Sequence, residues 1–244
     1  MPSEANGQRS DPTLGVVLLD CDHYTDRFGR FAPTDERGLG SLPAGFFESP
    51  ATWPVGTVFA VAPGAQPNET IRGTLQATEG LVESVGVLAP HCDLIVADCG
   101  FFWAARARTQ LPGTTLVSGL DLLDLAGVMT SQPIGLLTFS EQDARNLLAD
   151  HPLYDRLRVV GLIDQPNWNA LDDTAFGDSG KWTVDGLRDE LLDVVAHELR
   201  DGAFKDAGVL VLECTCLPQF RADLRGLTTL PILDAASVAK MALT

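Results

Sequence analysis

The chain has 244 residues, of which 45% are hydrophobic and 20% are charged. This composition is ordinary for a globular protein and excludes collagenous, low-complexity and wholly disordered chains. The 17 Lys and Arg residues against 33 Asp and Glu residues give a formal net charge of −16, and no basic cluster interrupts it. Nucleic acid and anionic membrane surfaces are therefore poor candidate partners.

Targeting signals and disulfides are not expected. Residues 1–13 are polar and contain proline, so they predict a flexible N-terminus rather than a secretory signal. No apolar run approaches the roughly 20 residues that span a bilayer. Five cysteines without regular spacing argue against a secreted disulfide framework. We expect a cytoplasmic protein with reduced thiols and no membrane partner, and a homo-oligomer is left open.

Short apolar runs alternate with amphipathic stretches along the whole chain. The apolar runs predict strands at 14–19, 57–62, 93–98, 114–118, 133–138, 157–163, 208–213 and 230–233. The amphipathic stretches predict helices at 68–88 with Asn68 as N-cap, 101–110, 120–128, 141–149 with Ser140 as N-cap, 184–205, 217–225 and 235–243. The stretches 21–55 and 164–183 are predicted to be long loops. This alternation is typical of an α/β fold with parallel sheets.

One pattern occurs twice in the chain. Residues 92–102 (CDLIVADCGFF) and 207–217 (AGVLVLECTCL) each contain an apolar strand, then an acidic residue, then a cysteine, then the start of a helix. The equivalent cysteines are Cys99 and Cys214. Two such units predict two lobes related by a pseudo-twofold axis, each a parallel sheet flanked by helices.

The expected division of the chain follows from this repeat. After the flexible N-terminus at residues 1–13, residues 14–117 and 227–244 are assigned to lobe 1. Residues 118–226 are assigned to lobe 2. The ligand site is expected between the lobes, because ligands of open parallel sheets bind beyond the carboxyl ends of the strands.

Cys99 and Cys214 are both predicted at such strand ends. The N–H groups of the following helix favour negative charge, which lowers a thiol pKa and suits a carboxylate ligand. A carboxylate directly before each cysteine would raise the thiol pKa instead, and the sequence does not decide which effect is larger. Two thiols on opposite faces of a carbon acid can transfer a proton in both directions without a cofactor.

Further residues at strand ends are expected to bind the substrate. They are the hydroxyl residues Ser118, Thr138, Ser140 and Thr215, together with Asp20 after the first strand and Gly100 at the start of the helix after Cys99.

The other cysteines have weaker assignments. A lone cysteine at a strand end is more often a small buried hydrophobe, and this interpretation holds for Cys21 and Cys92. Cys216 is ambiguous, since it could serve packing or place a third thiol near the site. The chain has no His and Cys set with metal-ligand spacing and no Gly-rich phosphate loop, so we expect no metal and no cofactor.

Several motifs carry a resemblance to a known family. They are LGVVLLD at 14–20, PATWP at 50–54, DCGF at 98–101, LECTCLP at 212–218 and LPILD at 230–234. Together they resemble the aspartate/glutamate racemase superfamily, and within it a branch that includes algal-type dimethylsulfoniopropionate lyases. The resemblance implies that Cys99 and Cys214 are the acid/base pair and that groups around Ser118 and Thr138 bind a substrate carboxylate. Asp98 and Cys216 depart from the usual family pattern beside the two cysteines.

These observations predict an isomerase. We expect a cofactor-independent racemase or epimerase that inverts the α carbon of a small carboxylate-bearing amino or related acid by proton transfer between two cysteines. Two alternatives stay open. One is a lyase or decarboxylase that uses the same site, and the other is a non-catalytic binding protein with the same fold.

Overall fold

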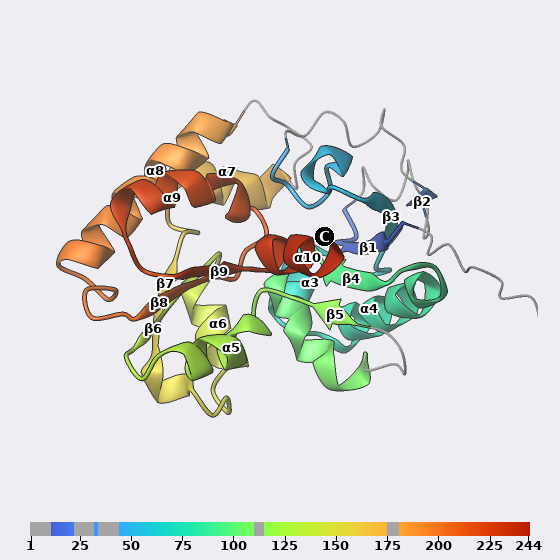
Figure 1. Cartoon of the computed structure of the whole chain (residues 1–244), viewed down its shortest axis with the longest axis horizontal. Helices are drawn as coiled ribbons and strands as arrows, with labels where there is room; N and C mark the ends of the chain where they lie inside the picture. The colour runs from blue at the N-terminus through green and yellow to red at the C-terminus, as the bar shows by residue number, and fades with distance from the viewer. Residues whose placement is uncertain (1–10, 22–31, 34–43, 110–114, 175–180) are drawn as a thin grey trace, which may run out of the picture.

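Two sheets lie side by side, each covered by helices (Figure 1). The computed structural model describes residues 11–21, 32–33, 44–109, 115–174 and 181–244. The first sheet has the strand order β2-β3-β1-β4-β5 and the second has the order β7-β6-β8-β9. The strands are β1 (Thr13–Leu18), β2 (Ala32–Pro33), β3 (Gly56–Val61), β4 (Leu94–Ala97), β5 (Leu116–Val117), β6 (Ile134–Thr138), β7 (Leu157–Gly161), β8 (Val209–Leu212) and β9 (Ile232–Asp234).

Helices connect most of these strands. The α-helices are α3 (Pro67–Ile71), α4 (Leu75–Leu88), α5 (Leu122–Met129), α6 (Glu141–Leu147), α7 (Pro166–Thr174), α8 (Val184–Arg200), α9 (Arg221–Leu227) and α10 (Ala235–Leu243). The 3-10 helices are η1 (Pro50–Thr52), η2 (Ala89–His91), η3 (Gly100–Arg108), η4 (Tyr154–Arg156) and η5 (Pro218–Phe220). In the part of the chain with described coordinates, no helix is both long enough and apolar enough to cross a membrane.

The two sheets repeat one topology. Apart from β2, which is antiparallel to β3, the pairs within each sheet are parallel. Among the parallel strands of each sheet, the first in sequence lies between the next two, since β1 lies between β3 and β4 and β6 lies between β7 and β8. Strand β1 therefore corresponds to β6, and β4 corresponds to β8. The predicted α/β fold of two related lobes is therefore confirmed.

Each sheet is buried on both faces, which explains why its strands are almost continuously apolar. In the second lobe, α8 and α9 lie on one side of the sheet and α5 and α6 lie on the other (Figure 1). In the first lobe, α4 packs against Val17 and Ala60 on one face. On the other face α10 packs against Val16 and Phe59.

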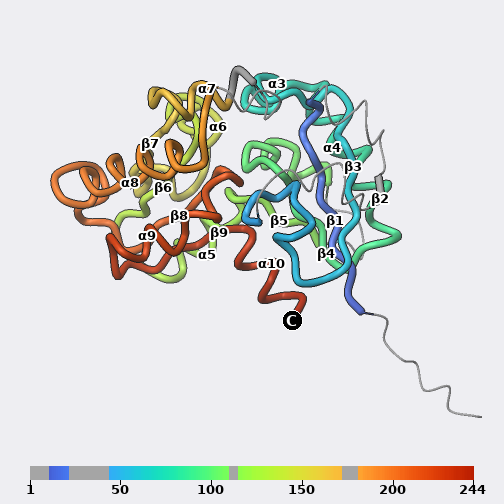
Figure 2. The backbone as a smooth tube through the Cα atoms, turned by 90° about the horizontal axis from the view of Figure 1, so that it is seen from above, coloured from blue at the N-terminus to red at the C-terminus, as the bar shows by residue number. Residues whose placement is uncertain are grey.

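The lobes exchange one helix each. Helix α5 follows β5 of the first sheet but packs against β8 of the second sheet, whereas α10 follows β9 of the second sheet and packs against β4 of the first (Figure 2). The expected division of the chain is corrected at this point. Residues 227–244 were assigned to lobe 1, but Ile232 pairs with Leu210 in the second sheet, and only α10 joins the first. Ile232 is buried, and β9 therefore extends the second sheet beside β8.

Several predicted elements differ from the observed ones. The helix expected at 68–88 is two helices, because Gly73 has a φ of 62° and breaks the chain between α3 and α4. Asn68 is not an N-cap, and Thr74 caps α4 instead by accepting a hydrogen bond from Ala77 N–H. Ser140 caps α6 as predicted.

Parts of the predicted loops and of the predicted flexible N-terminus lie outside the described residues. The loop predicted at 164–183 contains α7, whose Trp168 is fully buried. The flexible N-terminus predicted at 1–13 lies mostly outside the described residues, and β1 already begins at Thr13.

Two glycines of α4 provide a matched test of packing. A Cβ at Gly80 would lie 2.1 Å from the Pro63 carbonyl oxygen, whereas a Cβ at Gly86 would meet no atom within 4 Å. We expect Gly80→Ala to lower the free energy of unfolding by about 1–3 kcal/mol, because the backbone must move. Gly86→Ala is expected to raise it by about 0.5–1 kcal/mol through helix propensity. Denaturant unfolding measures both, and equal effects would contradict the described packing of α4.

Candidate active site

The two predicted catalytic cysteines lie at equivalent positions of the two lobes. Cys99 follows β4 and is the N-cap of η3, and Cys214 follows β8. Both strands are central in their sheets and are buried throughout, which fixes the position of the residue that follows each of them.

One cavity between the lobes contains both thiols. Its lining residues are Leu19, Cys21, Glu48, Pro67, Ile71, Asp98, Cys99, Phe101, Phe139, Leu171, Glu213, Cys214, Thr215 and Cys216. The wall is largely apolar, and its polar groups are thiols, carboxyls and one hydroxyl. The two strand ends that carry the repeated sequence pattern therefore meet at one cavity.

The acidic residue before each cysteine contacts the opposite lobe, and the two contacts are equivalent. Asp98 of the first lobe accepts a hydrogen bond from the Thr215 hydroxyl of the second, with 3.1 Å between the oxygens. Glu213 of the second lobe packs so closely on Gly100 of the first that a Cβ there would lie 2.2 Å from Glu213 Oε1. Each acid therefore contacts the residue that directly follows the opposite cysteine.

Glu213 is held beneath the Cys99 end of the cavity. The Thr138 hydroxyl donates a hydrogen bond to Glu213 Oε2 at 2.7 Å. Hydrogen bonding by the backbone N–H groups of Phe139, Gly100 and Phe101 lowers the pKa of Glu213, as the Thr138 hydroxyl does. Burial is the larger influence and raises the pKa of Glu213 from 4.5 to about 7.

The surroundings of the Cys99 thiol decide whether its pKa is raised or lowered. Burial and the nearby Glu213 raise the pKa of Cys99 well above its usual value. The Phe101 N–H at the start of η3 acts in the opposite direction but is weaker. Cys99 is therefore a thiol at neutral pH and is suited to donate a proton.

Cys216 is a neighbour of Cys214, the second thiol predicted to be catalytic. Its side chain is buried in the cavity wall and donates a hydrogen bond to Cys214. This hydrogen bond is the largest influence that raises the pKa of Cys216, followed by burial. Cys21, interpreted above as a small buried hydrophobe, also lines the cavity.

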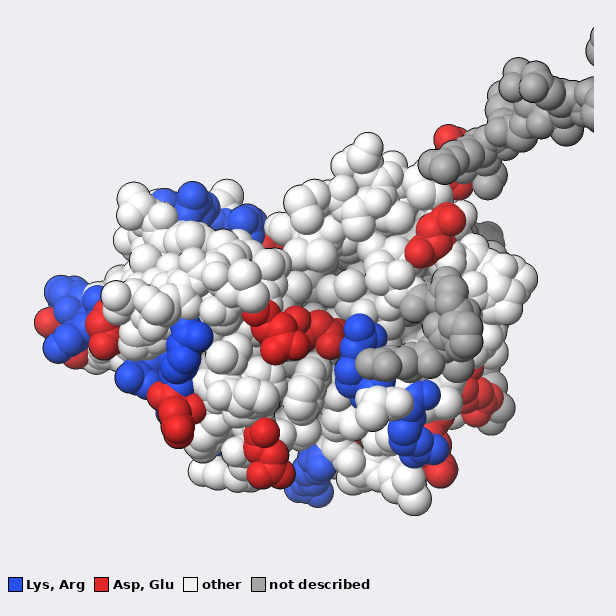
Figure 3. Space-filling model, turned by 60° about the horizontal axis from the view of Figure 1, so that its bottom comes forward, with Lys and Arg blue, Asp and Glu red and all other residues white. Residues whose placement is uncertain are grey.

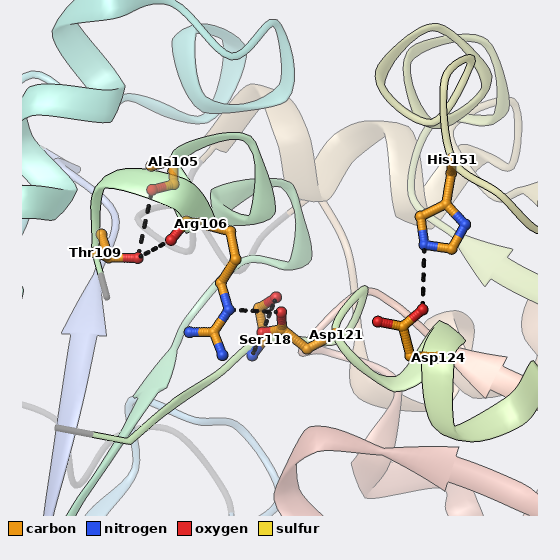
Figure 4. Close-up of polar contacts among 7 residues, drawn as sticks. All are labelled: Ala105, Arg106, Thr109, Ser118, Asp121, Asp124 and His151. Carbon is orange, nitrogen blue, oxygen red and sulfur yellow. Dashed lines mark hydrogen bonds and ion pairs between the residues drawn. The ribbon is translucent and has the colours of Figure 1, made fainter. Parts of the chain in front are cut away.

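The predicted substrate-binding residues are placed less favourably. Of these residues only Thr215 lines the cavity, and its hydroxyl donates to Asp98. Ser118 donates to Asp121, which also pairs with Arg106 (Figure 4).

The remaining predicted binders are likewise engaged within the protein. The Ser140 hydroxyl donates to Asp143, and Asp20 accepts the Gly64 N–H at 2.6 Å. Thr138 donates to Glu213, as described above. Each predicted hydroxyl thus donates to a protein carboxylate rather than pointing a free O–H into the cavity.

Glu48 is a cavity residue that the sequence analysis missed. It lies in the described segment before η1 and is only 2% exposed. Its carboxyl hydrogen-bonds with that of Asp98 inside the cavity. The available signal was a single charged residue between Phe47 and Ser49 in an otherwise apolar stretch. Such a residue is costly to bury unless it is paired.

Comparisons with solved structures agree with this architecture. Allantoin racemase from Klebsiella pneumoniae is 18% identical, with a TM-score of 0.59 over 96% of this chain and 86% of that one. Allantoin racemase from Pseudomonas fluorescens is 14% identical, with a TM-score of 0.54 over 95% of this chain and 88% of that one. Aspartate racemase from Picrophilus torridus is also 14% identical, with a TM-score of 0.52 over 95% and 92% of the two chains.

The chain has the fold of these racemases. This is the fold that the resemblance of the motifs around Cys99 and Cys214 implies. No protein family profile and no curated protein sequence matches the chain. At identities of 14–18% the likeness extends to the racemase fold alone, so the chemistry must be argued from the cavity.

Two further properties of the surface and the site bear on ligands. On the face that Figure 3 shows, basic side chains are scattered and are interspersed with acidic ones. Among the described residues, no group of three or more His, Cys, Asp and Glu side chains is arranged to hold a metal ion.

Proposed function

We propose that this protein is a cofactor-independent racemase or epimerase that moves a proton on and off a carbon bound between Cys99 and Cys214. The observation that carries the proposal is that these two thiols come from different lobes and line one cavity within a racemase fold. A carbon placed between two thiols can lose a proton to one of them and receive a proton from the other on its opposite face. The expected substrate is a small carboxylate-bearing amino or related acid.

The surroundings of the thiols suggest a role for each in one direction. Cys214, which lines the same cavity beside Cys216, removes the α proton. Cys99, kept as a thiol by burial and by Glu213, delivers a proton to the opposite face. The reverse direction starts from the opposite protonation states, and solvent must exchange protons with the thiols between turnovers.

A lyase or decarboxylase is the second candidate. The observation that favours it is the inequality of the two thiols, since burial and Glu213 raise the pKa of Cys99, whereas Cys214 has a third thiol, Cys216, as its neighbour. Such a site could use one cysteine for proton transfer while a different bond of the substrate breaks.

The proposal is tested by proton exchange in D₂O. Purified protein is incubated with a panel of amino acids, hydantoins, arylmalonates and dimethylsulfoniopropionate, and the α-proton signal is followed by NMR. We expect loss of that signal for at least one compound, with retention of all other protons. If no compound of the panel exchanges its α proton or breaks down, a binding protein with the same fold becomes the better description.

Activity is expected to be independent of metal ions. Thiols are sufficient for proton transfer, and no described group of side chains is arranged to hold a metal. Treatment with EDTA followed by gel filtration should change the exchange rate by less than about twofold, because no step of thiol acid/base chemistry uses a metal. Loss of exchange that a divalent ion restores would contradict the two-cysteine account.

A further inference from the structure

The cavity contains more thiols than the proposed reaction uses. Its described lining includes Cys21, Cys99, Cys214 and Cys216, and proton transfer is assigned to Cys99 and Cys214 alone. Cys216 is buried in the wall and donates a hydrogen bond to Cys214, so the two thiols are in contact. A reactive thiol in contact with a second thiol is the arrangement from which a disulfide can form.

A tight turn after β8 brings Cys214 and Cys216 together. The Leu217 N–H donates a hydrogen bond to the Cys214 carbonyl oxygen at 3.0 Å, which closes the turn. Gln219 Nε2 donates to the Cys216 carbonyl oxygen at 2.9 Å, and the Thr215 hydroxyl is bound to the opposite lobe. These hydrogen bonds hold the backbone on both sides of each thiol, so the contact between the thiols is a fixed feature of the cavity wall.

The two thiols differ in their access to a reagent. Cys214 is partly exposed, whereas Cys216 is only 7% exposed. A reagent that enters the cavity therefore reaches the Cys214 sulfur more readily. Cys216 is the neighbouring thiol that can complete a second step at the Cys214 sulfur.

We propose that Cys214 and Cys216 are a site of reversible oxidation, at which a small disulfide such as oxidised glutathione converts the two thiols into a Cys214–Cys216 disulfide. The Cys214 thiolate attacks one sulfur of the small disulfide, whose S–S bond breaks as a mixed disulfide forms. The first released thiol takes the proton of Cys214.

The second step forms the internal disulfide. Cys216 attacks the Cys214 sulfur, the mixed disulfide breaks, and the second released thiol takes the proton of Cys216. The small disulfide gains the two electrons that the cysteines lose. The internal disulfide occupies Cys214, a thiol on which the proposed racemase depends, until a thiol reductant restores it. The oxidation itself requires no racemase activity.

Peptide mapping after oxidation tests this proposal. The reduced protein is incubated with oxidised glutathione, the remaining thiols are blocked with N-ethylmaleimide in denaturant, and the chain is digested with trypsin. Cleavage after Lys and Arg places the cavity cysteines on three peptides, with Cys21 on 10–27, Cys99 on 73–106, and Cys214 and Cys216 together on 206–221. Mass spectrometry therefore distinguishes the possible disulfides.

We expect peptide 206–221 to be lighter than its reduced form by two hydrogen atoms. This internal disulfide should be at least about ten times more abundant than the same peptide with bound glutathione, because an oriented neighbouring thiol has a high effective concentration. Dithiothreitol should restore the reduced peptide.

Cys216→Ala separates the two steps. The variant can complete only the first step, so the fraction of Cys214 that carries glutathione should rise by at least about tenfold. Cys99→Ala and Cys21→Ala are matched controls, since each removes a different thiol from the same cavity. Both should leave the yield of the internal disulfide within about twofold of the wild type, because neither thiol takes part in the two steps.

Phenylarsine oxide provides a second measurement that needs no variant. The reagent forms two As–S bonds with a pair of neighbouring thiols and releases one water molecule, without any change of oxidation state. We expect one phenylarsenic group on peptide 206–221 of the wild-type protein. Dithiothreitol should remove it, whereas the monothiol glutathione should not.

Three results would overturn the proposal. The first is a wild-type peptide 206–221 that keeps both thiols or retains glutathione. The second is a disulfide that joins this peptide to 73–106 or to 10–27, since the second thiol would then be on another segment. The third is an arsenic bridge between two peptides. None of these measurements uses a substrate, so their failure leaves the racemase proposal intact, and failure of the exchange assay in D₂O leaves the oxidation site intact.

Discussion

Replacement of Cys99 or of Cys214 with alanine is expected to abolish racemisation, with a loss of at least about 10³-fold in the rate of enantiomer interconversion. Each thiol serves one face of the carbon, so the remaining thiol has no partner that completes inversion. The measurement is the initial rate of enantiomer interconversion for the wild type and each variant, with the substrate found in the exchange screen.

Cys216→Ala is the matched control for this prediction. It removes a thiol from the same cavity wall, but it deletes only a hydrogen bond to Cys214. Since such a bond contributes about 1 kcal/mol, we expect a loss of no more than about tenfold. Equal losses for Cys214→Ala and Cys216→Ala would mean that the catalytic thiol has been assigned to the wrong member of the pair.

The stability of the fold is expected to decrease as the pH rises, because of Glu213. Its pKa is raised from 4.5 to about 7 in the folded state, so the folded protein keeps a proton that the unfolded chain has already released. The stabilisation is fully present below pH 4.5 and is lost as the pH rises through about 7. Between pH 5 and pH 8 the free energy of unfolding should fall by about 2–3 kcal/mol through this group.

Glu213→Gln isolates this contribution. The variant cannot ionise at this position, so its loss of stability over the same pH range should be smaller than that of the wild type by about the same 2–3 kcal/mol. Asp98, whose pKa is also raised, contributes in the same direction and remains in both proteins. Denaturant unfolding at each pH provides the comparison, and Asp206→Asn is the exposed control. Parallel curves for the wild type and Glu213→Gln would show that Glu213 is not buried as described.

The sequence predicted those features that depend on local patterns. Apolar runs mark buried parallel strands, so β1, β6 and β8 lie close to their predicted positions. The repeated strand, acid and cysteine pattern located Cys99 and Cys214, because the topology of each lobe brings the same strand end to the cavity.

Features that depend on distant contacts could not be predicted in this way. The partner of the Thr215 hydroxyl is Asp98, 117 residues earlier in the chain, and no local pattern links them. The sheet to which β9 belongs depends on packing against β8. Glu48 lies in a segment without a periodic pattern, and only its burial beside Asp98 shows its place in the cavity.

The observed hydrogen bonds change the expected chemistry of the site more than its location. Hydroxyl groups expected to bind a substrate carboxylate donate instead to Asp98, Glu213 and other acids of the protein. Among the described residues that line the cavity, none is a Lys, Arg or His that would bind an anion. The two thiols remain the groups on which the proposed reaction depends.

Chiral chromatography of the reaction in D₂O, combined with analysis of released gas, tests the role of the two thiols most directly. One pure enantiomer is incubated with the wild-type protein. The product enantiomers are separated, and the mass of each is measured by mass spectrometry. The two-cysteine account predicts that the opposite enantiomer forms with one deuterium at the α carbon and that no gas is released. Carbon dioxide or a volatile sulfide without enantiomer exchange, or an inverted product that has kept the original proton, would contradict it.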